Sequence, residues 1–525
     1  MADKAFTPSR KTSNSSAIRN SFRLISVLRV LLPDYRALRR YVAGTNHEAP
    51  TRFVKHLEGL GPAFVKLGQM LSTRPDLMPQ AYVDALSRLQ ENGPEVPAEA
   101  IRATIEKELA KPLEELFSTF EPRPVAAASL SQVHRATMQD GTVVAVKIQR
   151  PNLEWLVWRD LDAIEVGLQW FHRLFPRRLK RTNLRAFFEE FRRYTLQELD
   201  FSVEGRVIDR IRANFQGRVN IKFPTVFWSH TRQRVLTMGW VEGLRLHEAA
   251  RSLDAKAKQQ LVTLLVDVML QMFVSDGLFH ADLHPGNIFF HPDGSFTLLD
   301  FGMYGELTLP QRDRFILYWF AVVQRQTRRA FHHFKAQTGM LPGANEEAFF
   351  VRFAALAEKF YTSHLSEMSF TKVYLEMMKA GYEYGFVFPS ELMLHAKALT
   401  TAETLIFVLA PDARFEQLSR PFIAREYAAR VGSLELLKRR VSQLAPELLL
   451  LGELLPAESL DQTWDWEATV DVYKEEGHTN IIDDKVQIMR YLAVDCRAHV
   501  SQNETCRRAE NQQQRILDKE FDIPL

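Results

Sequence analysis

The sequence predicts an α+β protein with two lobes, a small one that holds a sheet and a larger helical one. Two β-rich runs, 131–138 and 142–149, are separated by Gln-Asp-Gly at 139–141, which is typical of a hairpin turn. Apolar residues at three- and four-residue steps predict helices over 48–120 and again from 309 to the end. The chemically distinctive motifs lie between these regions, so we expect the functional site at the junction of the lobes.

Length and composition limit the class of protein without indicating its chemistry. The chain of 525 residues is longer than one typical domain of roughly 150 residues. Its composition, with 46% hydrophobic and 25% charged residues, excludes disordered, collagen-like and disulfide-scaffold chains. With 67 Lys and Arg against 64 Asp and Glu, the net charge of +3 predicts neither a nucleic-acid partner nor an acidic substrate. The two cysteines, Cys496 and Cys506, are too few for a disulfide framework, and we expect free thiols in a reducing compartment.

The N-terminal segment is basic, and its one acid before residue 33 is Asp3. An apolar stripe over 22–32 follows, but two arginines interrupt it before it reaches the length of a secretory signal. Three interpretations stay open: a basic amphipathic helix on an anionic membrane, an organelle transit peptide, or a helix docked on the core. No stretch of about 20 uncharged apolar residues is present, and 448–455 reads as a buried or interfacial helix, so we expect a soluble or peripheral protein.

The other elements follow in an order that supports two lobes. Proline-containing breaks interrupt the first helical region at three places: 61–62, 74–75 and 93–94. A long helical stretch covers 153–211, and helical periodicity resumes at 246. Strand patterns occur at four further places: 219–227, 233–238, 288–290 and 295–299.

Two motifs carry most of the chemical information. The segment 280–287 reads His-Ala-Asp-Leu-His-Pro-Gly-Asn, and Asp-Phe-Gly follows at 300–302. Phosphoryl transfer needs a carboxylate that orients the attacking group and accepts its proton, and Asp282 fits that role. Asn287 and Asp300 fit as magnesium ligands, because Mg²⁺ prefers hard oxygen donors. Their order and spacing match the catalytic and metal-binding loops of kinases, which predicts a protein-kinase-like fold.

The same segment has an alternative interpretation as a metal site. His280 and His284 have the spacing of a metal pair on a helix. Pro285 and Gly286 favour a loop, and no third ligand is evident, so we expect a structural role for His280 instead of zinc binding.

Lys147 ends the Val-Ala-Val-Lys run of the second predicted strand. A lysine on a buried strand is costly unless it meets anions, and phosphates are the natural ones. Its partner should be a glutamate on a helix, for which Glu204 is our choice; Glu189 and Glu190 compete, since spacing alone does not decide.

Alanines stand where a kinase would have its glycine-rich loop. Ala126, Ala127, Ala128 and Ser129 precede the predicted hairpin. Alanine cannot adopt positive φ without steric cost, so this loop should approach a nucleotide differently, although its backbone N–H groups can still donate.

At this point the sequence resembles the AarF/UbiB atypical kinase-like family over roughly 51–415. The resemblance rests on Lys-Leu-Gly-Gln at 66–69, the alanine-rich loop, Glu-Leu-Asp at 198–200 and the stretch 399–411. It implies that Glu204 is the helix C glutamate. It also implies that Lys66 and Gln69 point into the cleft, with Lys66 near Glu198 or Asp200, and block access for a protein substrate. We therefore expect a regulatory role for these four residues.

The resemblance also implies an organisation and a nucleotide site. The expected parts are a basic N-terminal segment, a helical extension, an N-lobe, a C-lobe and a helical tail, at 1–45, 46–120, 121–242, 243–425 and 426–525. Met238, Trp240 and Val241 connect the lobes where adenine would bind. Gly239 departs from the acidic residue frequent in the family, which puts the nucleotide preference in doubt.

The function implied is that of a Mg²⁺-dependent ATPase or phosphotransferase that supports ubiquinone or other isoprenoid-lipid metabolism at a membrane surface. The expected cofactors are ATP or ADP and Mg²⁺, and the expected partners are membrane lipid or an isoprenoid-quinone precursor, without nucleic acid; a homodimer is left open. We expect a cytoplasmic protein, peripheral at the inner face of a membrane, with organelle import as the alternative. Two other functions stay open: a small-molecule kinase of the aminoglycoside or choline kinase type, and a nucleotide-gated, non-enzymatic lipid-binding scaffold.

Overall fold

The computed structural model describes the chain in these ranges: 14–39, 48–72, 74, 77–87, 89, 93, 95–174, 184–362 and 370–431. Cys496, Cys506, the run 448–455 and nearly all of the expected tail lie outside the described residues. The chain divides into two compact units, Met1–Ala424 and Arg425–Leu525. The elements and the site described below belong to the first unit, apart from the last residues of the final helix.

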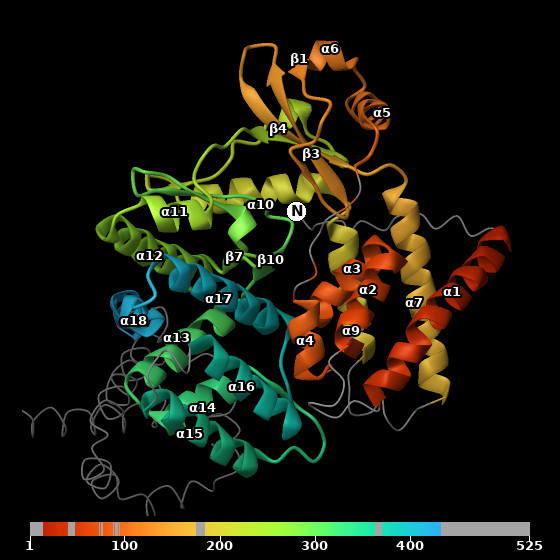
Figure 1. Cartoon of the computed structure of the whole chain (residues 1–525). Helices are drawn as coiled ribbons and strands as arrows, with labels where there is room; N and C mark the ends of the chain where they lie inside the picture. Colours follow the sequence, from red (N-terminus) through yellow and green to blue (C-terminus); the bar gives the residue numbers. More distant parts are fainter. Residues whose placement is uncertain are drawn as a thin grey trace, which may run out of the picture. The chain divides into compact units, whose positions relative to one another are not determined.

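An antiparallel sheet forms the small lobe (Figure 1). It contains β1 (Phe117–Phe120), β2 (Ala126–Ala127), β3 (Ser131–Met138), β4 (Val143–Gln149) and β6 (Val235–Gly239), in the order β1-β3-β4-β6 with β2 on β3. Successive side chains of a strand point to opposite faces. Val144, Val146 and Ile148 are therefore buried together against Ile101 and Ile105. Lys147 consequently faces the other side of the sheet.

Helices precede this sheet: α1 (Asn14–Arg39), α2 (Glu48–Leu60), α3 (Pro62–Leu71), α4 (Gln80–Leu86), α5 (Ala98–Leu109) and α6 (Leu113–Leu116). The break predicted at 61–62 is confirmed, because α3 begins at Pro62, a position that proline favours. Gly68 lets α3 pack closely, since a Cβ there would clash with a methyl group of Leu89. The prediction of helix up to residue 120 is wrong at its end, because Phe117–Phe120 pairs with β3 as a strand.

Within the long helical stretch predicted over 153–211, the described residues form α7 (Leu153–Leu174), α9 (Leu184–Gln197) and α10 (Phe201–Asn214). The break between α9 and α10 has a local cause. Asp200 has an extended backbone, and its carboxylate accepts hydrogen bonds from the N–H of Ser202, at 3.0 Å, and from its hydroxyl. It therefore caps α10, and α9 cannot continue through it.

The strand predicted over 219–227 is mostly absent. Only β5 (Ile221–Lys222) forms there, parallel to β9, and a 3₁₀ turn, η1 (Trp228–His230), follows. The short strands predicted around 288–299 are confirmed as β8 (Ile288–Phe290) and β9 (Phe296–Leu298).

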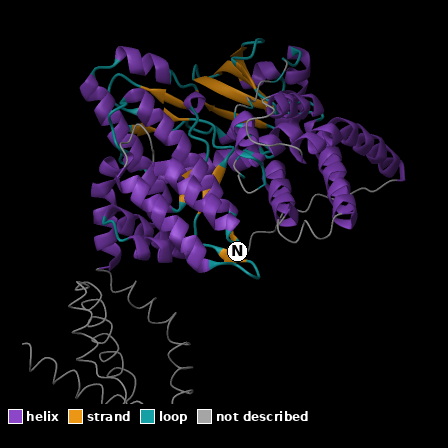
Figure 2. Cartoon of the chain, turned by 60° about the horizontal axis from the view of Figure 1, so that its bottom comes forward, coloured by secondary structure: helices purple, strands orange, loops and turns teal. Residues whose placement is uncertain are grey.

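The large lobe is mainly helical (Figure 2). Its first helices and strands are α11 (Leu246–Ser252), α12 (Ala255–Leu270), the π-helical turn η2 (Gln271–Asp276), β7 (Leu278–His280), η3 (Pro285–Asn287) and β10 (Tyr304–Glu306). The later ones are α13 (Leu309–Val323), α14 (Thr327–Lys335), β11 (Gly339–Met340), α15 (Glu346–Thr362), α16 (Phe370–Glu383), β12 (Phe386–Val387), α17 (Ser390–Leu409) and α18 (Phe415–Val431).

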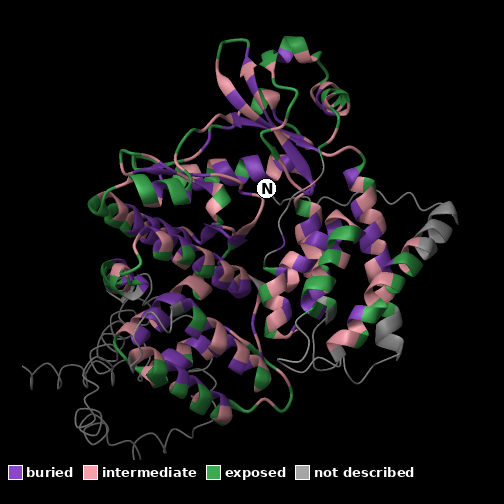
Figure 3. Ribbon diagram, viewed as in Figure 1, coloured by how far each residue is buried: buried purple, intermediate pink, exposed green. Residues whose placement is uncertain are grey.

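The core of this lobe is aromatic, and α17 runs through it (Figure 3). His395 of α17 is fully buried, and its ring packs edge-to-face against four aromatic rings: Phe273, Phe279, Phe315 and Tyr374. Burial lowers the pKa of His395 to about 3, so this histidine is a neutral core residue. The rest of α17 is thus anchored firmly in the lobe.

Two helical segments, Ala255–Asp276 and Glu391–Leu409, are long and apolar enough by composition to cross a membrane. In each, 56% of the apolar window is buried inside the protein, and both contain charged residues, such as Asp267 and Lys397. Core helices of globular proteins give the same pattern, so these segments are weak evidence for a membrane span.

Candidate active site

The central feature of the site is a cluster of three charged residues from distant elements. Lys147 projects from β4, Glu204 from α10 and Asp300 from the loop after β9. The Lys147 Nζ atom lies 3.0 and 2.9 Å from the two carboxylate oxygens of Glu204 and 3.1 Å from Oδ1 of Asp300. The structure therefore pairs Lys147 with Glu204, whereas Glu189, a competing candidate, is exposed on α9.

This cluster contains one more negative than positive charge when all three groups are ionised. Burial raises the pKa of Glu204 to about 7. The positive charge of Lys147 acts to lower this pKa, and the negative charge of Asp300 acts to raise it. Burial acts to raise the pKa of Asp300 too, but Lys147 outweighs it and holds this pKa below its usual range. Desolvation acts to lower the pKa of Lys147, but the two carboxylates raise it above its ordinary value. A divalent cation beside Asp300 would offset the surplus negative charge.

Glu204 should make the stability of the protein depend on pH near neutrality. A carboxyl whose pKa is raised by folding gives stability that is present below its unfolded pKa of about 4.3 and is lost as pH rises through its folded pKa. We compare the unchanged protein (the parent) with the variant Glu204→Gln. As the pH rises from about 5 to 8, the free energy of unfolding of the parent minus that of the variant should fall by on the order of 1–3 kcal/mol. Urea denaturation of both proteins across that range measures it.

The matched control is Glu189→Gln, which removes an exposed carboxylate. The pKa values of Asp300 and Lys147 are displaced away from this window, to lower and higher pH. A difference between the parent and Glu204→Gln that stays constant from pH 5 to 8 would contradict the assignment.

The backbone of Asp300 is in the left-handed region, with φ of 53°. This conformation is uncommon outside glycine and recurs at functional sites. Phe301 is fully buried against His280 and Phe223, and the N–H of Gly302 donates to Oδ1 of Asp300 at 3.3 Å. The buried ring thus anchors the loop, while 46% of the Asp300 side chain stays exposed.

Asp282 lies in the loop after β7, and its neighbours hold that loop in place. The Asp282 N–H donates to Nδ1 of His280 at 3.1 Å, and Nε2 of His280 lies 3.0 Å from the carbonyl of Leu299. Both ring nitrogens of His280 are therefore engaged, which gives this residue a structural role. The side-chain amide of Asn287 donates to the carbonyl of Asp282 at 3.1 Å.

The residues present fit a magnesium ion. The Asp300 carboxylate is half exposed, and Asn287 and Asp300 offer hard oxygen donors of the kind Mg²⁺ takes together with phosphate oxygens. Within the described part of the chain no group of three His, Cys, Asp or Glu residues could hold a metal by itself. Such a donor set suits a metal that arrives with a nucleotide better than a resident structural ion.

The alanine-rich segment is not an open loop. Ala126 and Ala127 form β2 on β3, and the N–H of Ala128 donates to the carbonyl of Ser131 at 2.8 Å. The carbonyls of Ala127 and Ala128 accept from the N–H of Gly93, at 3.2 Å, and from Arg150, at 2.9 Å. The hydroxyl of Ser129 is buried and has no hydrogen-bond partner among the described residues.

The segment that connects the lobes presents backbone more than side chains. Met238 is buried opposite Ala145 of β4. The backbone N–H of Trp240 donates to the carbonyl of Val143 at 3.1 Å, and the Trp240 ring packs under the Arg135 guanidinium. Val241 is half-buried.

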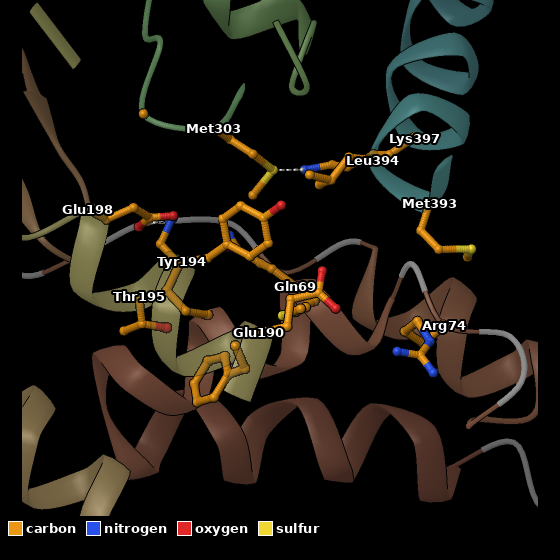
Figure 4. Close-up of a pocket in the computed structure, with 14 residues that line it drawn as sticks. Gln69, Arg74, Glu190, Tyr194, Thr195, Glu198, Met303, Met393, Leu394 and Lys397 are labelled. Carbon is orange, nitrogen blue, oxygen red and sulfur yellow. Dashed lines mark hydrogen bonds and ion pairs between the residues drawn. The ribbon is translucent and has the colours of Figure 1, made fainter. Parts of the chain in front are cut away.

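Three of the residues expected to be regulatory, Lys66, Gln69 and Glu198, line a small cavity between α3, α9 and α17, whereas Asp200 does not (Figure 4). Lys66 Nζ lies 2.8 Å from Oε2 of Glu198, and both side chains are nearly buried. The side-chain oxygen of Gln69 is buried without a hydrogen-bond partner among the described residues. Of the two acids in the Glu-Leu-Asp motif, Glu198 pairs with Lys66, whereas Asp200 caps α10.

Lys397 of α17 is a site residue that no sequence motif indicated. Its Nζ lies 3.1 Å from Oδ1 of Asp282 and 3.2 Å from the sulfur of Met303. It also lines the same cavity as Lys66 and Gln69, as Figure 4 shows for Lys397 and Gln69.

Comparison with protein families matches residues 88–334 to the ABC1 atypical kinase-like domain. An uncharacterised protein of Synechocystis sp. is 33% identical over 370 residues, which cover 70% of this chain and 63% of that protein. A second Synechocystis protein is 32% identical over 370 residues, covering 67% of this chain and 89% of that protein. ACTIVITY OF BC1 COMPLEX KINASE 7, chloroplastic, of Arabidopsis thaliana is 30% identical over 400 residues, covering 74% of this chain and 55% of that protein.

The chain thus spans less than two thirds of the length of the first Synechocystis relative and about half of the Arabidopsis protein. Among solved structures, the Rv3197–erythromycin complex from Mycobacterium tuberculosis matches with 22% identity and a TM-score of 0.49, covering 67% of this chain and 90% of that one.

Proposed function

The chain belongs to the ABC1 atypical kinase-like family, and from this premise we propose a Mg²⁺-dependent ATPase or phosphotransferase that supports ubiquinone or another isoprenoid-lipid pathway at a membrane surface. The resemblance to the AarF/UbiB family is confirmed at the level of the family. The acceptor, the pathway, the membrane and a homodimer are parts of the proposal.

One observation carries the catalytic part of this proposal. Lys147 joins Glu204 and Asp300 at 2.9–3.1 Å, although 57 and 153 residues of chain separate them. Kinases require a lysine held by a helical glutamate and a metal-binding aspartate at the same place. A merely structural lysine would not need two carboxylates in a half-open site.

Each residue of the candidate site has a distinct role in the proposed reaction. Lys147, oriented by Glu204, binds phosphate oxygens of the nucleotide, and Asp282 accepts the proton of the attacking hydroxyl or water. Asp300 and Asn287 would hold Mg²⁺, which neutralises charge on the phosphates when it is bound. Lys66 and Glu198 close the site on the side of α3 and limit which acceptor can reach Asp282.

The membrane part of the proposal rests on α1. Ile25, Leu28 and Leu32 are 44–49% exposed and lie on one face of this helix, whereas Val27 is buried. Arg29 is exposed beside them. Exposed apolar residues next to a cation on a helix suit the surface of an anionic bilayer. Arg23 has another task, because it pairs with the buried Asp160 at 2.8 Å.

We expect anionic vesicles to raise the rate of ATP hydrolysis by the full chain through this face of α1. The triple change Ile25→Glu, Leu28→Glu and Leu32→Glu should abolish vesicle binding and the stimulation, while leaving the rate without vesicles unchanged. Vesicle flotation and phosphate release with phosphatidylglycerol and with phosphatidylcholine vesicles measure both effects.

The control carries Glu at two exposed positions away from α1, Val219 and Val351. Equal stimulation of the triple variant and this control would contradict the membrane assignment.

The acceptor is tested by phosphate release from MgATP with anionic vesicles, with and without an isoprenoid-quinone precursor. Turnover that needs no acceptor supports an ATPase, and labelled phosphate on the precursor supports phosphotransfer. Transfer to a soluble aminoglycoside or choline alone would replace the lipid part of the proposal. Nucleotide binding without turnover would identify a scaffold.

The location is part of the same proposal. We place the protein at the inner face of a membrane, and the chloroplastic names of the Arabidopsis relatives make organelle import the alternative.

A further inference from the structure

Lys397 reaches the catalytic loop from α17, and it lies just before the stretch 399–411 that supports the family resemblance. Its ammonium lies 3.1 Å from Oδ1 of Asp282. Its other contact is the sulfur of Met303, at 3.2 Å, a weak acceptor, so most of the charge compensation comes from the ion pair with Asp282 (Figure 4). The side chains of Lys397 and Asp282 are 23% and 33% exposed, so both groups remain accessible to a ligand.

The position of this lysine on its helix is unusual for a core element. Its neighbours Met393, Ala396, Ala398 and Leu399 are all buried. His395 fixes the same turn of α17 in its aromatic surroundings. A cation held rigidly among buried residues costs desolvation, which a single half-exposed carboxylate offsets only in part. A phosphate at the same place would add the missing compensation.

The other lysines of the cleft are committed elsewhere. Lys147 binds Glu204 and Asp300, and Lys66 binds Glu198. Lys397 is the lysine in direct contact with Asp282, the residue that must lie next to the attacking oxygen. In the proposed reaction the ammonium of Lys397 would therefore lie beside the attacking oxygen, on the acceptor side of the phosphoryl group.

We propose that Lys397 is a catalytic residue that contacts the transferring phosphoryl group from the acceptor side, an inference that rests on the proposed function. In this step the acceptor oxygen forms a bond to the γ-phosphorus while the bond from that phosphorus to the β–γ bridging oxygen breaks. The electron pair of the broken bond stays on the ADP product, and the acceptor proton passes to Asp282. Lys397 stabilises the negative charge on the equatorial phosphoryl oxygens and leaves Asp282 free to take the proton.

The test separates binding of the nucleotide from stabilisation of the transferring group. In Lys397→Met we expect kcat for MgATP hydrolysis to fall about 10–100-fold, with KM for ATP nearly unchanged. Affinity for MgADP should also stay unchanged, whereas the tightening of ADP binding by aluminium fluoride, a mimic of the transferring group, should be lost. Lys397→Arg should recover part of both effects because it keeps the charge.

Lys256→Met is the matched control, since this lysine is exposed at the start of α12. Lys397→Gln serves as a second neutral variant if Lys397→Met does not fold. Normal turnover and normal tightening by aluminium fluoride in the neutral variants would overturn the inference and leave the proposed function intact. Faster turnover would also overturn it, because Lys397 would then restrain Asp282. Failure of the parent to bind MgADP would instead remove the proposed function itself.

Discussion

Asp282→Asn should lower kcat for MgATP hydrolysis by about 10²–10⁴-fold, the usual contribution of a general base. Asparagine has the same shape and keeps the backbone contacts of residue 282 with His280 and Asn287, so the loop should hold its conformation. The amide cannot accept the proton and no longer carries the charge that pairs with Lys397. Nucleotide affinity should change little, because Asp282 is not among the expected magnesium ligands.

Phosphate release and calorimetric titration with MgADP measure the two quantities on the same preparation. Asp412→Asn is the control, since Asp412 is exposed in the turn after α17. Turnover within experimental error of the parent would contradict the assignment of Asp282 as the base.

Asp300→Asn should abolish Mg²⁺-dependent nucleotide binding while leaving the fold intact. The residue has positive φ, which asparagine tolerates better than most residues, and Phe301 continues to anchor the loop. The change removes the carboxylate that would hold the metal and the charge that faces Lys147. A ligand at one hundred times its dissociation constant stabilises a protein by about 2.7 kcal/mol, and this gain should disappear.

Thermal unfolding with and without MgADP or MgATP measures this gain in the parent and in Asp300→Asn. Asp293→Asn provides a control with another loop aspartate, which pairs with Lys222 in the β8–β9 turn. Nucleotide-induced stabilisation that survives in Asp300→Asn would show that the metal-binding assignment is wrong.

The hairpin and the two loop motifs could be predicted because each depends on local sequence. Turn residues between β-rich runs indicated the β3–β4 hairpin, and β4 is observed at Val143–Gln149. The pairing of Lys147 could not be decided from spacing, because Glu189, Glu190 and Glu204 all lie on helices. The family resemblance favoured Glu204, and the three-dimensional structure places this residue beside Lys147.

Other features depend on tertiary contacts that periodicity does not record. The Phe117–Phe120 strand and the alanine strand β2 exist because β3 offers them an edge. The apolar stripe of α1 was one feature in the sequence, yet packing divides it into the buried Val27 and the exposed Ile25, Leu28 and Leu32. Propensity alone cannot decide which residues of such a stripe face the protein.

Lys397 was missed for the same reason. Its helix reads as core, in which one lysine is most simply a residue that extends to solvent. Only the packing of α17 brings it to Asp282, more than one hundred residues earlier in the chain. The part of the site that the motifs describe was therefore accessible from sequence, and the acceptor side was not.

The most direct test of the whole account is equilibrium binding of ADP and ATP to the purified full chain, with Mg²⁺ and with excess EDTA. The account predicts saturable binding of one nucleotide per chain that requires Mg²⁺ and is lost in Asp300→Asn. No binding, or binding equally tight in EDTA, would contradict the claim that Lys147, Glu204 and Asp300 form a magnesium–nucleotide site.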